Sequence, residues 1–510
     1  MTEELKQALY NDIELFETKL RAHDAGEMDK KAYKGFSGGY GSYAQRNGGN
    51  MLRLRMAGGR MCRDRLAWLA DRVEQYGIDR LKLTTCQTVQ MHNVPSEVVG
   101  DIMRSAMDVG IYTRGGGGDF PRNVMVSPLS GVEAGEYFDV RPWAEGLADY
   151  LLTKVRDIKL PRKLKVAFSN GPANVTHATI RDLGFAARED GTFDVYCAGG
   201  MGPNAKVGVK VAEGVAPADV CACADAMIHV FTTFGNYENR AKSRTRYLQD
   251  TLGEDGLRAE FAKALEGALA ASPKLDVQSQ PIVKAADGAV EDGRAIPQKQ
   301  EGLYAVSYHP LGGNLDPKMP RILHDTVKDM DQVELRIAPG GTLYIINLTG
   351  EEAKRVLAAT AGGATTPFQH SVCCIGASIC QQGVRDSQAL LARLLAAVEE
   401  AGLPADALPT IHISGCPSSC GTQQIGTLGF QGGVKLVDGK PQPAFSLTLY
   451  GEDRQGAERL GKPMGAMVEG DIPAFLVELG RTVAASGRDF MTWMAAHEGD
   501  LETLAARYIG

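Results

Sequence analysis

The sequence has no long hydrophobic run. Within its 510 residues, no stretch approaches the ~20 consecutive apolar residues that a membrane-spanning helix needs. The N-terminus, MTEELKQALYNDIELFETKLRAHDAG, mixes acidic and basic residues in an amphipathic helical pattern, without the apolar segment or the small-residue cleavage site of a signal peptide. We therefore expect a cytoplasmic protein with no membrane partner.

An excess of positive charge is also missing. Lysine and arginine total 55 against 62 aspartates and glutamates, which gives a formal net charge of −7. Nonspecific nucleic-acid binding usually needs a basic face, so we expect no nucleic-acid partner, although a local basic pocket is still compatible with this balance. The rest of the composition is typical of globular proteins, and the length exceeds one hydrophobic core, which predicts two to four domains.

The ten cysteines do not suit a disulfide framework, because a cytosolic compartment keeps thiols reduced. Metal or redox chemistry is the better explanation for a dense group. Four isolated cysteines are best explained as small core residues or single thiols: Cys62, Cys197, Cys221 and Cys223. The dense group lies in HSVCCIGASIC and IHISGCPSSCGTQ and consists of Cys373, Cys374, Cys380, Cys416 and Cys420.

Counted from Cys374, the dense group has the spacing C-x5-C, a helix-like stretch and then C-x3-C. Four soft thiolates in two pairs suit zinc or an iron–sulfur cluster. Structural zinc sites favour shorter knuckles, so a five-residue gap beside a long helix fits zinc poorly. From the spacing alone, an iron–sulfur cluster, a zinc site and a coincidence of core cysteines all stay open.

The chain contains a candidate internal repeat. Residues 81–99, LKLTTCQTVQMHNVPSEVV, align without gaps with residues 335–353, LRIAPGGTLYIINLTGEEA. In both copies we expect a short basic strand, a turn, a second strand and the start of a helix. Few positions are identical, so chance similarity between two α/β segments is the alternative. A true repeat predicts a pseudo-twofold protein with a site between its halves.

Cationic segments gather in the first part of the chain. Arg53 lies in MLRLRMAGG, Arg122 in DFPRNVMVSP, and Lys163 and Lys165 in LPRKLKVAFSN. Isolated cations of this kind are usually solvated strand ends. Strand alternation, however, points Lys163 and Lys165 to one face, where two ammonium groups repel each other unless an anion lies between them. Together these segments predict an anion pocket.

The cysteines, the cationic segments and the repeat together resemble the siroheme-dependent sulfite and nitrite reductases, over about residues 35 to 500. LTTCQTVQMHNV is similar to a family motif in which TTRQ precedes an aromatic residue and His-Gly, so the resemblance places His92 against siroheme. FGNYENRAKSRTRYL is similar to the basic segment that closes the same domain. VYCAGGMGPNAKVG resembles the glycine-rich loop whose backbone approaches the macrocycle, with Gly199, Gly200 and Gly202 in the matching places.

The resemblance implies two cofactors, siroheme and a [4Fe–4S] cluster. It implies that the Cys420 thiolate also bridges the cluster to the siroheme iron, and that the cluster ligands are Cys374, Cys380, Cys416 and Cys420. It further implies that two arginines and two lysines act on the substrate anion, here Arg53, Arg122, Lys163 and Lys165. Such cations lower the free energy of binding a charged oxyanion, and lysines can also give protons.

The fold implied by the resemblance is an α/β (α+β) pseudo-twofold nitrite/sulfite reductase fold, with two ferredoxin-like half-domains and two α/β domains that bind siroheme and cluster. We expect five parts: an N-terminal extension (1–50), the first half-domain (51–115), a siroheme-binding domain (116–299), the second half-domain (300–365) and the cluster domain (366–510). Residues 285–302 are expected to form a linker. No flavin or nicotinamide domain is evident, so we expect electrons from a separate ferredoxin or flavoprotein.

The pattern Lys-x-Lys after LPR is similar to that of sulfite reductases, whereas nitrite reductases often have asparagine in the second position. Lys165 therefore favours reduction of sulfite to sulfide, with nitrite to ammonia as the alternative, since CIGASICQQGVRDS is also similar to a nitrite reductase form. Cys86 occupies a position where the family usually has arginine, and Ser418 and Ser419 stand where Asn-Gly is common. Because of Cys86, a non-catalytic relative that binds an anion or a tetrapyrrole is a second alternative.

Overall fold

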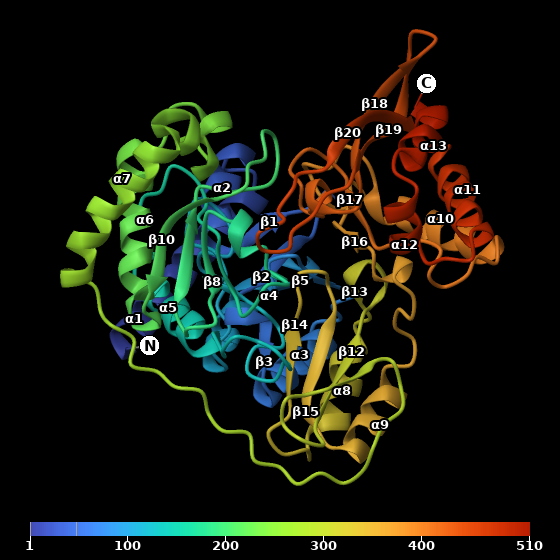
Figure 1. The fold of residues 1–510 in the computed structure, drawn as a ribbon. Helices are drawn as coiled ribbons and strands as arrows, with labels where there is room; N and C mark the ends of the chain where they lie inside the picture. The colour runs from blue at the N-terminus through green and yellow to red at the C-terminus, as the bar shows by residue number, and fades with distance from the viewer. Residues whose placement is uncertain (1, 47, 510) are drawn as a thin grey trace.

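The computed structural model describes residues 2–46 and 48–509, and its strands form four five-stranded sheets (Figure 1). Two of these sheets are antiparallel and belong to the repeated segments. The first consists, in spatial order, of β1 (Ser42–Ala44), β2 (Asn50–Leu54), β5 (Val89–Val94), β4 (Arg80–Leu83) and β13 (Asn314–Leu315). The second consists of β11 (Ala295–Pro297), β12 (Tyr304–Tyr308), β15 (Leu343–Leu348), β14 (Glu334–Ile337) and β3 (Arg60–Met61).

The two repeated sheets exchange their edge strands. β3 comes from the first repeat but pairs with β14 of the second, and β13 comes from the second repeat but pairs with β4 of the first. One hydrophobic core spans both sheets and their helices, which are α1 (Glu3–Asp24), α2 (Lys30–Ser37), α3 (Arg63–Gln75), α4 (Ser96–Asp108), α8 (Met319–Val327) and α9 (Gly350–Ala359). The halves therefore fold as one unit.

The structure confirms the internal repeat. β4 and β14, and likewise β5 and β15, occupy the aligned residues. Asn93 and Asn347, which face each other in the alignment, both have a left-handed backbone, with φ of 57° and 63°. Each exchanges two hydrogen bonds with a glutamine: Gln45 in the first half and Gln298 in the second. Such matched irregular geometry excludes chance similarity.

The other two sheets share one topology, in which two parallel strand pairs are followed by two antiparallel pairs. One consists of β6 (Met125–Val126), β7 (Val166–Ser169), β8 (Leu183–Ala187), β9 (Phe193–Cys197) and β10 (Val209–Val215), with α5 (Arg141–Thr153), α6 (Val220–Phe234) and α7 (Leu248–Ala271). The other consists of β16 (Val372–Cys373), β17 (Ile411–Ser414), β18 (Leu428–Val437), β19 (Lys440–Leu449) and β20 (Lys462–Val468), with α10 (Ser387–Glu400), α11 (Ile472–Ala485), α12 (Phe490–Ala496) and α13 (Asp500–Ile509).

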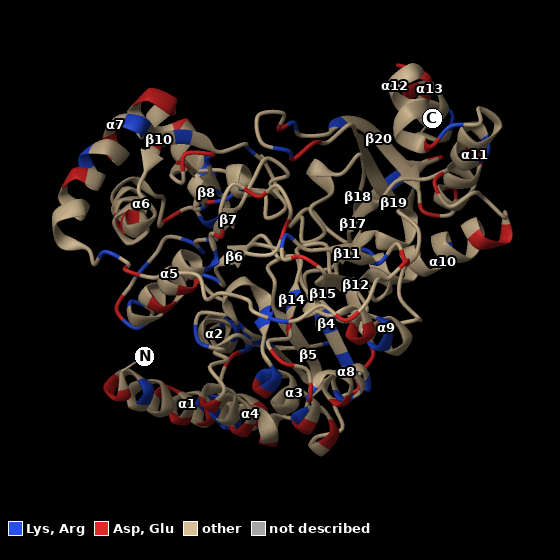
Figure 2. Ribbon diagram, turned by 60° about the horizontal axis from the view of Figure 1, so that its bottom comes forward, with Lys and Arg blue, Asp and Glu red and all other residues tan. Residues whose placement is uncertain are grey.

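The elements differ in detail from the five expected ranges. α1 packs into the core of the half-domains and β1 pairs with β2, so residues before 51 are part of the first half-domain. The connection between the two halves is extended over residues 273–294, and β11 already belongs to the second sheet before residue 300. No helix within residues 2–46 and 48–509 is long and apolar enough to cross a membrane. Both signs of charge alternate on outer helices such as α1 and α7 (Figure 2).

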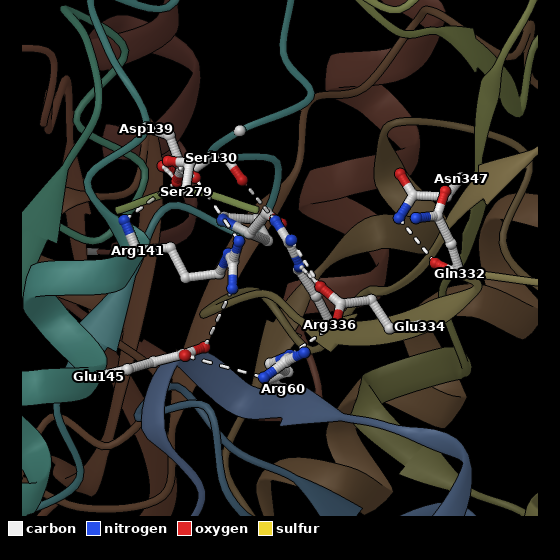
Figure 3. A network of polar contacts seen from close by, with 12 residues as sticks. Arg60, Ser130, Asp139, Arg141, Glu145, Ser279, Gln332, Glu334, Arg336 and Asn347 are labelled. Carbon is white, nitrogen blue, oxygen red and sulfur yellow. Dashed lines mark hydrogen bonds and ion pairs between the residues drawn. The ribbon is translucent and has the colours of Figure 1, made fainter. Parts of the chain in front are cut away.

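A buried ionic network joins the half-domains to the first α/β domain (Figure 3). Glu334 on β14 accepts from Arg60 of β3 and pairs with Arg336, both at 2.5 Å. Arg60 and Arg141 also lie within 3.7 Å and 3.6 Å of Glu145 on α5. Burial acts to raise the pKa of Glu334, but the guanidinium charges of Arg336 and Arg60 outweigh it and lower that pKa to about 2.

Replacing Glu334 with glutamine should therefore destabilise the protein at neutral pH. The folded pKa lies below the unfolded value of ~4.3, so the carboxylate contributes about 3 kcal/mol above pH ~4, and this is lost as pH falls towards 2. Urea unfolding at pH 7 and at pH 3 measures this contribution. The free energy of unfolding of Glu334→Gln should differ from that of the parent by more at pH 7 than at pH 3. Glu351→Gln, which removes an exposed pair with Lys354, serves as the control and should not change stability. Equal stability of Glu334→Gln and parent at pH 7 would contradict the network's role.

Candidate active site

A run of four glycines holds the two predicted substrate arginines. Arg53 extends from β2 and Arg122 precedes β6, and both donate to the carbonyl of Gly116, at 2.7 and 2.8 Å. Arg122 also donates to the carbonyl of Gly118 at 2.9 Å. A Cβ on Gly116 would lie 2.7 Å from the Thr113 carbonyl oxygen, so the backbone can pass here only as glycine. The loop at 115–118 thus fixes two guanidinium groups side by side.

Backbone pairing brings the predicted lysines to the same place. Arg122 N–H donates to the Leu164 carbonyl at 2.8 Å, and Leu164 N–H donates to Phe120. Leu164 is fully buried, so Lys163 and Lys165 point to the opposite face, half-buried. Burial lowers the pKa of Lys163 well below its usual value, and the charges of Arg244, Lys165 and Arg122 lower it further. Four cationic side chains therefore converge, and none of them forms an ion pair with a carboxylate in the part of the chain that the structure describes.

Two arginines that the sequence did not single out complete this group. Arg244 pairs with Asp182 at 2.9 Å, and Asp182 also accepts from the backbone N–H of Lys165 at 2.8 Å. Arg181 is only 3% exposed, and its Nη2 has no hydrogen-bond partner among the described residues. We call Arg53, Arg122, Lys163, Lys165, Arg181 and Arg244 the cationic cluster. A buried guanidinium nitrogen without a partner is the mark of a site built for an anionic group.

Cys86 lies at the cationic cluster. Burial acts to raise the pKa of its thiol, but the charges of Lys165, Arg181, Arg53 and Arg122 outweigh burial and lower it to about 6. Its backbone carbonyl accepts from Asn123 at 3.1 Å, and its side chain packs against Met125 and Ala167. The thiol therefore faces the pocket from the strand connection between β4 and β5.

His92 is on β5, on the face opposite the core residue Met91. It is 2% exposed, and its Nδ1 has no partner within the described part of the chain. Burial and the charges of Arg80, Lys82 and Arg53 lower its pKa to about 3, so the imidazole is neutral at physiological pH. A neutral buried ring can pack against an aromatic macrocycle.

The predicted cluster cysteines follow two neighbouring parallel strands. Cys374 comes directly after β16 and Cys416 shortly after β17, and the carboxyl ends of parallel strands meet at one edge of a sheet. The Cys374 Sγ accepts from the Gly415 N–H at 3.2 Å and lies 3.0 Å from the Ser387 Oγ. Ser387 is fixed because Asp386 caps the start of α10. Hydrogen bonds of this kind stabilise a thiolate ligand.

The remaining two cysteines lie close to this edge. The charges of Cys420 and Cys416 act on Cys380, and those of Cys374, Lys163, Lys165 and Cys416 act on Cys420. Cys420 is exposed at the surface, and burial of its thiol by surrounding groups raises its pKa. Cys373 instead points into the core of the second α/β domain, and burial raises its pKa to about 12. The structure thus brings together the four cysteines of the predicted set and separates Cys373 from them.

These four thiols are not arranged around a single ion. Among residues 2–46 and 48–509, no three His, Cys, Asp or Glu side chains converge as ligands of one metal ion do. Zinc needs its ligands within ~2.3 Å of one point. A [4Fe–4S] cluster instead binds each thiolate through a different iron atom, so the thiolates stay further apart.

The glycine loop connects the cationic cluster to the cysteines. Gly200 and Gly202 have φ of 156° and 109°, a region that favours glycine, and Gly199 is packed against the Arg181 backbone. Gly202 exchanges two hydrogen bonds with the side chain of Gln424, at 3.0 and 2.8 Å. From the first half-domain, the Thr85 hydroxyl donates to the Cys420 carbonyl at 2.9 Å. Three separate parts of the chain therefore meet at Cys420.

Two family models match the chain. Residues 43–109 match the nitrite/sulfite reductase ferredoxin-like half domain, and residues 117–269 match the nitrite and sulphite reductase 4Fe-4S domain. The chain therefore contains the ferredoxin-like and 4Fe-4S domains of nitrite and sulfite reductases. Members of the family use siroheme and a [4Fe–4S] cluster. The 4Fe-4S model matches the first α/β domain, whereas the four cysteines lie in the second, which has the same strand order.

Curated relatives carry both activities in their names. The ferredoxin–nitrite reductase of Synechococcus elongatus is 28% identical over 448 residues, which cover 84% of this chain and 85% of the relative. The sulfite reductase [ferredoxin] of Mycobacterium tuberculosis is 27% identical over 401 residues, or 76% of this chain and 70% of that protein. The fold matches the structure of the Mycobacterium tuberculosis NirA protein, with a TM-score of 0.78, 24% identity and coverage of 95% of both chains.

The residues present fit both cofactors. Siroheme is an anionic, carboxylate-rich tetrapyrrole. The cationic cluster offers an excess of positive charge over the single carboxylate of Asp182 and an unpartnered Arg181 nitrogen, beside the neutral His92. Four electrostatically coupled thiols, one of them already accepting a backbone N–H bond, fit a cluster. The chain is therefore a siroheme and [4Fe–4S] reductase of sulfite or nitrite.

Proposed function

We propose that this protein reduces sulfite to sulfide with six electrons, with nitrite reduction to ammonia as the alternative substrate chemistry. The supporting observation is Lys165. Its backbone is held by Asp182 and by Leu183 of β8, so its side chain is directed towards the Cys86, Arg181 and Cys420 side of the pocket. A second fixed ammonium group favours the more highly charged oxyanion, which is sulfite.

The four proposed catalytic residues divide into two roles. Arg53 and Arg122 are anchored by the Gly116 carbonyl, and a guanidinium group is a poor proton donor, so they hold and orient the oxyanion. Lys163 and Lys165 can donate protons to the substrate oxygens that leave as water. The lowered pKa of Lys163 makes it the stronger acid when charged.

For the cofactors, we propose that Cys374, Cys380, Cys416 and Cys420 bind the [4Fe–4S] cluster, and that Cys420 also ligates the siroheme iron. When bound, siroheme supplies the iron that takes up the substrate and the electrons for it. Gly199, Gly200 and Gly202 let the backbone approach the macrocycle, and His92 packs beside it. The hydrogen bonds of Thr85 and Gln424 support this assignment, because they hold the Cys420 segment against both partners.

The electron donor is proposed to be a ferredoxin. The relatives in Synechococcus elongatus and Mycobacterium tuberculosis carry ferredoxin in their names, and they align with this chain over most of its length. A flavoprotein donor is the alternative. Electron transfer from each purified donor to the holoenzyme distinguishes them.

Turnover of the holoenzyme with reduced methyl viologen tests the proposed substrate. We expect kcat/KM for sulfite to exceed that for nitrite, with siroheme bands in the visible spectrum of the same preparation. A higher kcat/KM for nitrite would assign the alternative. Siroheme bands without turnover on either anion would instead favour the non-catalytic relative, for which the thiol of Cys86 in place of a cation is the one supporting observation.

A further inference from the structure

Lys82 is a buried cation at the crossing of the two half-domains. It lies on β4 and pairs with Asn314 of the exchanged strand β13, and it is only 4% exposed. Its Nζ donates to the carbonyl of Gly312, in the 3-10 helix Leu311–Gly313 of the second half-domain. A Cβ on Gly313 would lie 3.0 Å from this Nζ, so the ammonium group is tightly enclosed.

A chain of three hydrogen bonds, the first of them from Lys82 to Gly312, connects this ammonium group to a cluster cysteine. The Gly312 carbonyl also accepts from Gln388 Nε2 at 3.3 Å, and the same nitrogen donates to the Cys374 carbonyl at 2.7 Å. The side chains of Cys373 and Cys374 are close enough to act electrostatically on Lys82. Lys82 therefore lies next to the proposed cluster site, where the second half-domain accepts its hydrogen bond and Gln388 of α10 connects it to Cys374.

The charge of Lys82 has no carboxylate partner. Within the part of the chain that the structure describes, no Asp or Glu lies within ion-pair distance of it, and burial lowers its pKa. Arg336, which occupies the equivalent position of the second half-domain, is neutralised by Glu334. A buried, unpaired ammonium group costs several kcal/mol unless an anion is nearby. Both half-domains therefore have a cation at this position, but only the second half-domain has a carboxylate that pairs with it.

The neighbouring His309 does not add to this charge. His309 is fully buried, and burial together with the charges of His370 and Lys82 lowers its pKa to about 3, so it is neutral. Its Nδ1 shares a hydrogen bond with the Thr342 hydroxyl at 3.0 Å. The fixed charge on this side of the cysteines is therefore that of Lys82.

We propose that Lys82 is a positioning residue that sets the reduction potential of the cluster held by Cys374 and its three partner cysteines. This inference rests on the proposed function, because it requires the cluster. A cluster with four thiolates is net negative, and uptake of one electron from the donor adds one negative charge without making or breaking a bond. A fixed cation nearby stabilises the reduced state more than the oxidised state and so raises the potential.

The test is a redox titration of the holoenzyme, monitored by the electron paramagnetic resonance signal of the reduced cluster. Lys82→Gln keeps a donor for Gly312 but removes the charge, and we expect it to disfavour reduction roughly tenfold, a ~59 mV lower midpoint for a one-electron couple. Lys82→Arg keeps the charge and should stay close to the parent value. Lys284→Met is the control, because the Lys284 side chain is also largely enclosed, at 9% exposure, but pairs with Glu352 in the second half-domain.

The possible results separate this inference from the proposed function. A Lys82→Gln protein with full iron and sulfide content and the parent potential would overturn the inference and leave the function intact. If Lys82→Gln fails to retain the cluster, Lys82→Met and Lys82→Arg test the inference instead. Retention of the cluster by Lys82→Arg but not by Lys82→Met supports a requirement for the charge. Retention of the cluster by Lys82→Met at the parent potential overturns the inference. A parent protein that binds no cluster after reconstitution would refute the proposed function itself.

Discussion

We expect Cys420→Ser to abolish turnover of both sulfite and nitrite. Cys420 is the point at which the first half-domain, through Thr85, and the glycine loop, through Gln424, meet the cysteine loop. Its thiol is also the one that the charges of Lys163 and Lys165 act on directly. Loss of an outer partner of a metal ligand typically costs 10- to ~100-fold in activity, so removal of a thiolate shared by two redox centres should exceed that.

Cys373→Ala is the matched control for this experiment. Cys373 is adjacent to Cys374, but its side chain packs in the core with Leu390 and Ile413. Its removal should lower stability by about 1 kcal/mol and leave cofactor content unchanged. Iron, acid-labile sulfide, the visible spectrum and methyl viologen turnover are compared in both variants. Full turnover by Cys420→Ser, or loss of the cluster from Cys373→Ala but not from Cys420→Ser, would refute the proposed ligand set.

Local patterns in the sequence predicted much of this arrangement. The gapless alignment of 81–99 with 335–353 predicted two equivalent strand pairs, because strand, turn and helix signals recur in the same order. The four-cysteine spacing predicted a metal or cluster site, and the alternation around Leu164 predicted that Lys163 and Lys165 share a face. Each of these inferences depends on residues that are neighbours in the chain.

Features that depend on distant pairing could not be predicted. The exchange of β3 and β13 between the half-domains joins strands that are far apart in the chain, such as Asn314 with Lys82 and Arg336 with Arg60. Arg181 and Lys82 look like ordinary strand-end cations in the sequence, and only the structure shows that both are buried and that Arg181 Nη2 has no hydrogen-bond partner among the described residues. The four consecutive glycines at 115–118 were the one signal in the sequence for the loop that holds Arg53 and Arg122, because such a run indicates close approach of the backbone to other groups.

Lys165→Asn is expected to reverse the preference between the two anions. The substitution removes one ammonium group from the cationic cluster and introduces the residue that is common at this position in nitrite reductases. Loss of a charge-assisted contact costs about 1.5–3 kcal/mol, and loss of a proton donor about 100-fold or more. We expect kcat/KM for sulfite to fall by at least ~100-fold, and that for nitrite by much less, because nitrite carries less charge.

Two further variants separate charge from proton transfer. Lys165→Arg keeps the charge but cannot readily give a proton, so KM for sulfite should stay close to the parent value while kcat falls. Lys159→Asn removes an exposed lysine from the same segment and should change neither value. An equal loss on both anions in Lys165→Asn would assign Lys165 to cofactor binding rather than to the choice of substrate. Unchanged sulfite turnover would remove the main support for sulfite, because the remaining cations, Arg53, Arg122 and Lys163, do not distinguish the two anions.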